Sequence, residues 1–158
     1  MKAIRKITPA GALERLQILC SAREKCTGDI KEKLRQWNIS GAESAVIISN
    51  LIRHKFIDDR RYAGYFVRDK QKLNKWGKEK IRYALMNKGL SKEIIDEALE
   101  ELQVENYEEA LRELLIKKSR ELNKYDPYEK KNRLIRFAAQ RGFDYELIFR
   151  LVDDYVRD

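Results

Sequence analysis

The sequence is poor in the residues on which many catalytic, metal-binding and disulfide-stabilised proteins depend. Its 158 residues include two cysteines, two prolines and a single histidine. Cys20 and Cys26 match the spacing of neither a zinc site nor a redox-active pair, so we expect free thiols in a reducing cytoplasm. His54 has no companion ligand, and no apolar run approaches the length of about 18 residues that spans a bilayer. These absences predict a cytoplasmic protein with no membrane segment, no metal and no cofactor.

The motifs of the common enzyme classes are also missing. There is no phosphate-binding loop of the Walker form, no GxSxG and no HExxH, so we do not expect an enzyme. The adjacent Asp58 and Asp59 have two interpretations, a metal site or a helix start. Neighbouring helical side chains point about 100° apart, a poor geometry for a shared ion. At a helix start, in contrast, one carboxylate caps N–H groups and both favour the positive end of the dipole. We adopt the capping interpretation.

Glycine and proline are scarce, and most of them stand where a helix is expected to begin or end. Thr8-Pro9 and Asp126-Pro127 each combine an N-cap residue with proline at the first helical position. Ser40-Gly41-Ala42-Glu43 and Asn106-Tyr107-Glu108-Glu109 have the pattern of capping boxes. Apolar residues recur at helical spacing, whereas hairpin signals and sustained period-two alternation are absent. The sequence therefore predicts an all-α fold.

The helix endings repeat along the chain. Lys88-Gly89-Leu90-Ser91 recurs as Arg141-Gly142-Phe143-Asp144, and earlier as Trp37-Asn38-Ile39-Ser40, where asparagine takes the left-handed position. We therefore predict three tandem three-helix repeats, with boundaries at 1–57, 58–104 and 105–158. Units that contact mainly their neighbours form an elongated, curved array rather than a ball. Three such units end to end would span on the order of 70 Å.

Charge is strongly segregated. Residues 60–92 hold eleven Lys or Arg against two acids, a net of +9, whereas the whole chain is +8. Residues 93–113 reverse the sign, with nine acids against Arg112, a net of −8, and residues 117–141 return to +6. Such a pattern attracts polyanions at one place and repels them at another. The acidic stretch has three interpretations: it neutralises neighbouring units, keeps its helix away from DNA, or meets basic groups of a protein partner.

We therefore take basic helical faces of the second and third units as the candidate binding surface. Tyr65 lies off the apolar stripe of its helix and is a candidate for stacking on a base. Trp76 is interpreted as a hydrophobic staple onto Ile81, with a stacking platform as the alternative. The candidate binding residues are Arg60, Arg61, Arg68, Lys72, Lys75, Lys78, Arg82, Lys88, Lys117, Lys118, Lys130, Lys131, Arg133 and Arg136.

The segment from Ile57 to Leu90 opens with two aspartates followed by an arginine-tyrosine-alanine run and ends at a lysine-glycine exit. The opening and the exit fall at the spacing of the central repeat of the RecX family, which regulates the RecA recombinase, and about a third of the chain resembles that repeat. One departure is that Cys26 stands where the family often has a Ser or Thr cap, and we expect Thr27 to take over. The residues that carry the resemblance are Ile57-Asp58-Asp59-Arg60-Arg61-Tyr62-Ala63-Gly64-Tyr65-Phe66-Val67-Arg68, Lys75-Trp76-Gly77, Ile81-Arg82, Leu85 and Lys88-Gly89-Leu90.

The resemblance implies a cytoplasmic, non-enzymatic monomer that lies in the groove of the RecA–DNA filament and limits RecA activity, within recombination, DNA repair and the SOS response. The basic faces also predict weak, sequence-independent binding of single-stranded DNA. Two alternatives stay open: a nucleic-acid-binding protein without a recombinase partner, and a helical scaffold that binds protein alone. A helix-turn-helix transcription factor is a further possibility, but three units in a row fit poorly with reading a palindrome as a dimer.

Overall fold

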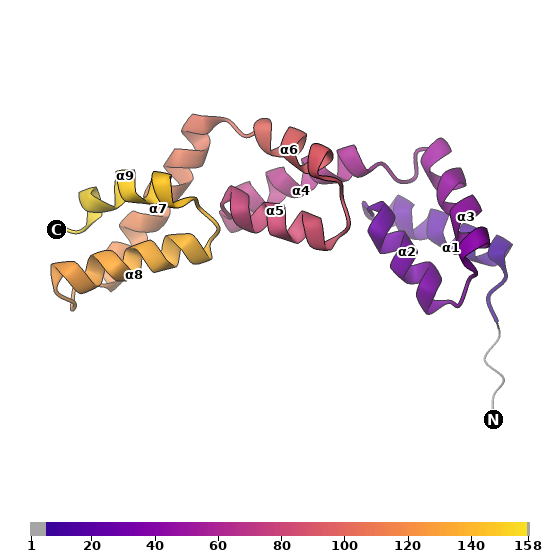
Figure 1. Cartoon of the computed structure of the whole chain (residues 1–158), viewed down its shortest axis with the longest axis horizontal. Coiled ribbons are helices and arrows are strands. Elements are labelled where there is room, and N and C mark those ends of the chain that lie inside the picture. Colours follow the sequence, from indigo (N-terminus) through magenta and orange to yellow (C-terminus); the bar gives the residue numbers. More distant parts are fainter. Residues whose placement is uncertain (1–5, 158) are drawn as a thin grey trace, which may run out of the picture.

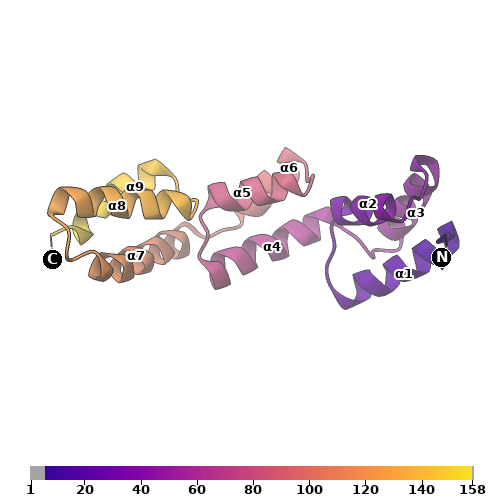
Figure 2. The same cartoon turned by 90° about the horizontal axis from the view of Figure 1, so that it is seen from below.

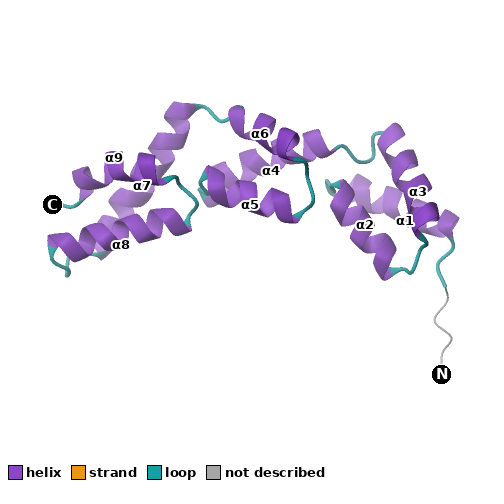
Figure 3. Cartoon of the chain, viewed as in Figure 1, coloured by secondary structure: helices purple, strands orange, loops and turns teal. Residues whose placement is uncertain are grey.

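The computed structural model describes residues 6–157, and every regular element in this range is a helix (Figure 3). The all-α fold class is thereby confirmed. Nine α-helices follow one another in the described range, and a short 3₁₀ helix, Asp153–Tyr155, ends it. The helices are α1 (Pro9–Ala22), α2 (Thr27–Gln36), α3 (Gly41–Arg53), α4 (Asp59–Asn74), α5 (Lys78–Asn87), α6 (Lys92–Glu100), α7 (Val104–Glu121), α8 (Pro127–Gln140) and α9 (Tyr145–Val152).

The helices form three successive units, each with its own hydrophobic core. Figure 1 shows the units end to end in a bent row, with α1–α3 at one end and α7–α9 at the other. The predicted elongated, curved array of three-helix repeats is confirmed, whereas the boundaries after residues 57 and 104 stay a prediction. The largest fully buried side chains are Leu16, Ile30, Leu34, Leu51 and Ile57 in the first unit, Ile81, Leu85 and Ile95 in the second, and Leu111, Leu115, Leu134 and Ile148 in the third.

Each unit contains the same left-handed exit from its second helix. Asn38, Gly89 and Gly142 have φ of 56°, 82° and 92°, as the repeat pattern predicts. The residue after each one donates its N–H to the carbonyl five positions earlier, for example Leu90 to Leu85 at 3.3 Å and Phe143 to Ala138 at 3.2 Å. This is the Schellman ending, in which an apolar contact accompanies the hydrogen bond. It turns the chain sharply into the third helix of the unit.

Asp58 and Asp59 both bind backbone N–H groups. The Asp58 carboxylate accepts the N–H of Arg61 at 3.1 Å and caps α4. The Asp59 carboxylate accepts the N–H of Thr27 at 2.7 Å, across the boundary with the first unit. Asp59 therefore does more than favour the dipole of its own helix, because it also caps the start of α2.

Two helix starts differ from the sequence prediction. Cys26, not Thr27, is the N-cap of α2, because Asp29 accepts the Cys26 N–H at 3.2 Å while Asp59 takes the Thr27 N–H. In the second case, α7 begins at Val104, so the capping box predicted at residues 106–109 is wrong. Tyr107 lies inside α7 and is buried in the third core, and the N-cap of the helix is Gln103.

The units are joined through their second helices. Figure 2 shows α8, α5 and α2 in one line along the array. The exit turn of α8 meets the start of α5, where Gly77 donates its N–H to the Arg141 carbonyl at 2.7 Å and Glu79 donates to Gly142 at 2.9 Å. The carbonyl end of one helix thus satisfies the free N–H groups of the next, and the two dipoles are aligned.

The joint between the first two units repeats this arrangement. The exit turn of α5 meets the start of α2, where the buried Cys26 Sγ lies 3.9 Å from the Lys88 carbonyl. At both joints a glycine permits the close approach, since a Cβ at Gly28 would overlap the Lys88 carbonyl and a Cβ at Gly77 would overlap Gly142. The two joints are therefore formed by the same kind of contact, in which the exit turn of one second helix packs against the start of the next.

Candidate nucleic-acid and partner interface

Carboxylates of the acidic stretch, residues 93–113, form ion pairs with several cations of the basic stretch, residues 60–92. α6 packs against both α4 and α5, and this places acidic side chains beside the cations of those helices. The uncompensated basic face predicted for the second unit is therefore wrong at four of the candidate binding residues, and Lys92, outside the candidate set, is paired as well. The ion pairs of the second unit with this stretch are Arg60–Glu97, Arg68–Glu101 at 3.8 Å, Lys75–Glu113, Arg82–Asp96 and Lys92–Asp96 at 2.8 Å.

These pairs are wholly or partly open to solvent, with Arg82 and Asp96 the most shielded of the set. The Arg60 and Glu97 side chains are 59% and 58% exposed, so water and salt screen their attraction. Hydrogen bonds from Lys92 and Arg82 lower the pKa of Asp96 below its ordinary value, which keeps the carboxylate charged. A polyanion could replace such carboxylates as the partner of the arginines, because exposed pairs contribute little to stability.

Two of the candidate cations lie at the joint between the first and second units. Arg61 pairs with Glu24 at 3.0 Å and also donates to the carbonyls of the loop that follows α3. Lys88 pairs with Asp29 at 2.7 Å. A hydrogen bond to Asp29 raises the pKa of Lys88. Burial opposes ionisation of Asp29, but the bonds from Lys88 and the Cys26 N–H outweigh it and lower the Asp29 pKa. Both cations thus hold the joint together.

The candidate cations of the third unit differ widely in accessibility. Lys130 is 3% exposed, and its Nζ donates to Asn123 Oδ1 at 2.9 Å, so its prediction as a surface contact is corrected. Its charge lies between α7 and α8 because residue 130 falls on the inner face of α8, beside the buried residue 134. The paired cations of this unit are Lys118 with Glu121 at 3.0 Å, Lys131 with Asp153 at 2.6 Å and Arg133 with Glu129 at 2.8 Å.

Some candidate cations keep their charge unpaired. Among the residues that the structure describes, Lys72, Lys117 and Arg136 are exposed and have no carboxylate within ion-pair distance. The Lys78 ammonium likewise faces no carboxylate and lies 5.1 Å from the centre of the Tyr107 ring. These four side chains are the part of the predicted basic surface that a phosphate can reach without displacing an acid.

A further group of cations, absent from the sequence prediction, surrounds Trp76. The ammonium groups of Lys70 and Lys80 lie 4.8 Å and 4.5 Å from the centre of its ring. The Arg141 guanidinium approaches from the third unit and donates to the Asn74 carbonyl at 3.0 Å. Trp76 packs on the second core, which favours the staple interpretation, and two lysines lie over its ring. Residues 76 and 141 are far apart in sequence, so no local signal joins them.

The joint between the first two units also holds a groove with aromatic walls. Its volume is about 610 Å³, and its walls include Tyr62, Tyr65 and Phe66 on α4. Tyr62 stacks on Phe66 with ring centres 6.0 Å apart, and burial raises the Tyr62 pKa. Tyr65 is 46% exposed, as expected for a residue off the apolar stripe. Arg23, Lys70 and Lys88 line the same groove together with Glu24 and Asp69. The groove thus combines rings with a small excess of positive charge, a combination that binds single-stranded nucleic acid.

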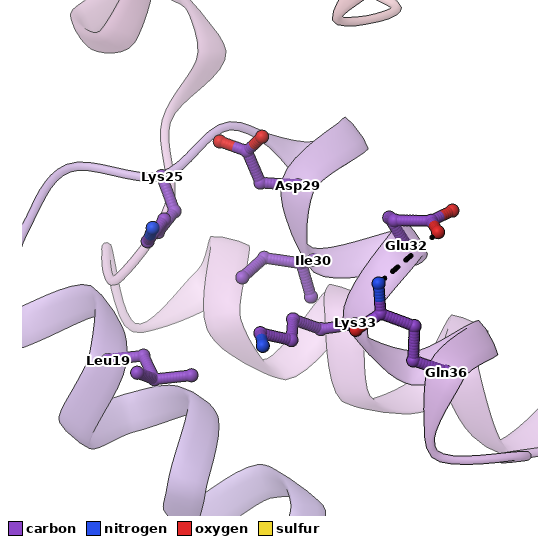
Figure 4. A pocket seen from close by; sticks show the side chains of 7 residues that line it. All are labelled: Leu19, Lys25, Asp29, Ile30, Glu32, Lys33 and Gln36. Carbon is purple, nitrogen blue, oxygen red and sulfur yellow. Dashed lines mark hydrogen bonds between the residues drawn. The ribbon is translucent and has the colours of Figure 1, made fainter.

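Among the described residues, the side chains that line the other hollows do not form an arrangement typical of a catalytic site. A shallow one of about 200 Å³ lies on α2, and Figure 4 shows its side chains, with Gln36 bonded to Glu32. Asp29 at its edge is held by Lys88. Within residues 6–157 there is no group of three or more possible metal ligands. The helices in this range also include none long and apolar enough to cross a membrane.

Family models match two segments of the chain, and relatives match most of its length. Models of the second and third three-helix domains of RecX match residues 58–99 and 105–152. The "Regulatory protein RecX" of Clostridium botulinum (strain Eklund 17B / Type B) is 36% identical over 137 residues, 84% of this chain and 62% of that protein. That of Chlorobium phaeobacteroides (strain BS1) is 33% identical over 139 residues, 88% of this chain and 89% of that protein.

Solved structures agree with the fold. A crystal structure of a regulatory protein RecX superposes with a TM-score of 0.85 at 24% identity, covering 92% of this chain and 71% of that one. RecX from Lactobacillus salivarius gives a TM-score of 0.85 at 22% identity, covering 93% and 96%. The chain spans about three fifths of the length of the Clostridium relatives, 62%, 61% and 59% for three of them.

Proposed function

The chain belongs to the RecX family, and on that premise we propose that it regulates the RecA recombinase by binding in the groove of the RecA–DNA filament. The proposed effect is inhibition without catalysis. The family assignment supports the partner, since the relatives that match it are named regulatory proteins. The protein acts as a monomer in the cytoplasm, where the recombinase works.

The observation that carries the proposal is the bent row of three units with unpaired cations along it. Its extended form suits a helical groove, because a row of units contacts several neighbouring protomers, whereas a ball contacts one or two. Lys72, Lys78, Lys117 and Arg136 offer positive charge to filament phosphates or to acidic RecA side chains. Lys70 and Lys80, beside Trp76, extend this set.

The ion-paired cations form a second set of proposed contacts, which become available only when their carboxylates are displaced. Arg60, Arg68, Lys75 and Arg82 exchange their carboxylates for phosphates when the protein enters the filament. The Arg60 and Arg68 pairs are exposed and weak, and the Lys75 and Arg82 pairs are partly open to solvent. Binding of the whole surface thus depends on a competition between the acidic stretch and DNA. Occupation of the groove would either block entry of the second duplex or hold protomers in a poor geometry for ATP hydrolysis.

The test is a RecA ATPase assay on single-stranded DNA with this protein added at substoichiometric amounts. We expect the hydrolysis rate to fall at ratios well below one protein per RecA, because one elongated molecule affects several protomers. A rate that stays constant up to an equimolar amount would contradict the proposal. A folded Lys72→Glu/Lys117→Glu/Arg136→Glu variant should inhibit less, and the difference should be greatest at low salt.

A second candidate function is single-stranded nucleic-acid binding without a recombinase. The aromatic groove beside Tyr62 and Tyr65 favours it, because rings with nearby cations stack on bases of any sequence. The test is fluorescence anisotropy with a labelled oligonucleotide in the absence of RecA. If about five phosphates are neutralised, the log–log salt slope should be near −3.5. Clear DNA binding by a protein that leaves RecA unaffected would favour this candidate over regulation.

A further inference from the structure

Two neighbouring hollows lie on the first unit and at its boundary with the second. One, of about 330 Å³, lies between the end of α3 and the starts of α4 and α6. The other, of about 470 Å³, lies between α2 and α3. Both are lined by Thr27 and Ile52, so they adjoin at these two residues. We call the two hollows together the isoleucine groove, lined by Thr27, Lys31, Ala45, Ile48, Ser49, Ile52, Arg53, Lys55, Ile57, Asp58, Asp59, Arg60 and Ile94.

The floor of the isoleucine groove is aliphatic. Ile48 and Ile52 are one helical turn apart on α3, and Ile94 completes the floor from α6 of the second unit. Ile52 is 51% exposed, whereas Ile57 beneath it is 1% exposed. A large aliphatic side chain in a hollow, with half its surface open to water, is a position that a partner's apolar side chain can cover.

The rim of the isoleucine groove carries unpaired positive charge. Within the described range, Lys31, Arg53 and Lys55 have no carboxylate within ion-pair distance. The rim carboxylates are engaged elsewhere, since Asp58 accepts from the Arg61 N–H and Asp59 accepts from the Thr27 N–H. An occupant therefore meets an excess of cations around an apolar floor.

This chemistry fits a protein rather than a nucleic acid. The groove has no aromatic ring on which a base could stack, in contrast to the groove beside Tyr62. Apolar side chains at helical spacing would fill the floor, and carboxylates flanking them would meet the three rim cations. We propose that the isoleucine groove binds an acidic, amphipathic segment of a partner protein. This function goes beyond the phosphate contacts proposed for the second and third units and does not depend on the partner's identity.

The experiment uses a fluorescein-labelled peptide of about 15 residues, roughly four helical turns. It carries leucine at positions i, i+3, i+4 and i+7 and mostly glutamate elsewhere. We expect saturable binding to the full chain by fluorescence anisotropy. A peptide of the same composition, with its leucines scrambled off one face, should bind at least about tenfold more weakly, since it cannot fill the floor while its charge is unchanged.

Matched variants locate the site. Ile52→Glu should weaken peptide binding at least about tenfold, because it places a carboxylate on the floor opposite an acidic ligand. Ile18→Glu is the control, since Ile18 is another exposed isoleucine of the first unit, 64% exposed, and lies outside the groove. It should leave binding unchanged. Lys31→Glu/Arg53→Glu should weaken binding with a reduced salt dependence. Circular dichroism checks that each variant keeps its helices.

Three results would overturn the proposal. Equal affinity for the ordered and scrambled peptides would mean that charge alone attracts them. A folded Ile52→Glu variant with full affinity would place the peptide elsewhere. A single-stranded oligonucleotide whose binding is lost in Ile52→Glu, but not in Ile18→Glu, would assign the groove to nucleic acid. The RecA ATPase assay keeps the two proposals apart, because peptide binding with no effect on RecA supports the groove and contradicts the regulatory function.

Discussion

At the scale of single residues, two glycines determine how closely the units approach one another. Gly28 and Gly77 stand at the starts of α2 and α5, against the exit turn of the next unit. The contact leaves no space for a side chain, and the facing atoms belong to backbone, which cannot move aside as a flexible side chain can. Most backbone bonds in the fold are local to one helix, whereas the bonds from Gly77 and Glu79 link two units.

We predict that Gly77→Ala destabilises the protein by about 1 to 3 kcal/mol, the usual cost of overpacking a tight site. Urea unfolding followed by circular dichroism measures the change. Gly41→Ala is the matched control, because Gly41 also lies at a helix start but has open space around it. It should be neutral or slightly stabilising. Equal effects of the two substitutions would contradict the proposed role of the close approach.

We predict that Asp29→Asn weakens the first joint in a pH-dependent way. The Asp29 pKa is lowered in the folded protein, so its contribution is present above the unfolded value of about 3.9 and is lost as pH falls through the folded value. Lys88, with a raised pKa, contributes below about 10.4 and loses its contribution as pH rises through the folded value. At pH 7 both contribute, and the substitution should cost about 1 kcal/mol after solvent screening.

Urea unfolding of both proteins between pH 3 and 7 checks this prediction, with the pH limits set on either side of the usual carboxylate range of about 4. The difference in unfolding free energy should shrink as Asp29 is protonated. Glu32→Gln is the control, because Glu32 lies in an exposed pair with Arg35 and its loss should leave stability unchanged. A difference that stays constant with pH would show that the Asp29 charge is not the cause.

At the scale of elements, α6 is the helix that decides what the basic stretch can bind. Its inner face packs into the second core through Ile95, Ala98 and Leu99. Its polar face then carries Asp96 and Glu97 against cations of α5 and α4. Reversal of Lys75 or Arg82 would therefore place carboxylate against carboxylate as well as remove a proposed phosphate contact. Substitution of the acids tests the interface more cleanly.

We predict that Glu97→Gln/Glu101→Gln raises the affinity for single-stranded DNA by about three- to tenfold at low salt, because Arg60 and Arg68 no longer have a competing carboxylate. Anisotropy with an oligonucleotide measures it, and the salt slope should steepen by about one unit. Glu100→Gln/Glu109→Gln is the control. It changes the net charge of the same acidic stretch by the same amount, but at exposed acids that form no ion pairs within the described range. An equal gain in that control would mean that net charge, not the pairing, limits binding.

At the scale of the whole molecule, stability and shape come from a row of small cores linked by two similar joints. Such an array bends at its joints more readily than within a core, because few contacts cross between units. The collinear α8, α5 and α2 form its axis (Figure 2). In the proposed function, the length of this axis is the property by which one molecule would span several protomers of a filament.

We predict a radius of gyration on the order of 20 Å by small-angle scattering, against about 15 Å for a compact chain of this length. The value should hold at high salt, since the joints rest on hydrogen bonds and close packing as well as on ion pairs. A compact value would remove the argument that the molecule spans several protomers. A large increase at high salt would instead show that ion pairs alone hold the units together.

Much of the fold follows from rules that act over a few residues. Asn38, Gly89 and Gly142 were predictable as left-handed exits because sterics limit which residues adopt positive φ. Helical spacing predicts an apolar stripe of Tyr62, Ala63, Phe66 and Val67 on α4, of which Ala63 and Val67 are fully buried and Tyr62 and Phe66 are half-buried against the second core. The three-unit plan followed from repetition of these signals. For the candidate site, the same local reasoning placed Lys72, Lys117 and Arg136 on exposed faces.

The tertiary structure alone decided which charges are free. The sequence shows a net of +9 beside a net of −8, but the pairing of Arg60 with Glu97 depends on how α6 lies against α4. Lys130 lies between two helices and Arg141 reaches Asn74 of another unit, contacts that no local pattern encodes. Local sterics determine helices, turns and repeats, because they act between neighbours along the chain. Electrostatics and docking act through space, so the packed molecule determines which surface is left to bind.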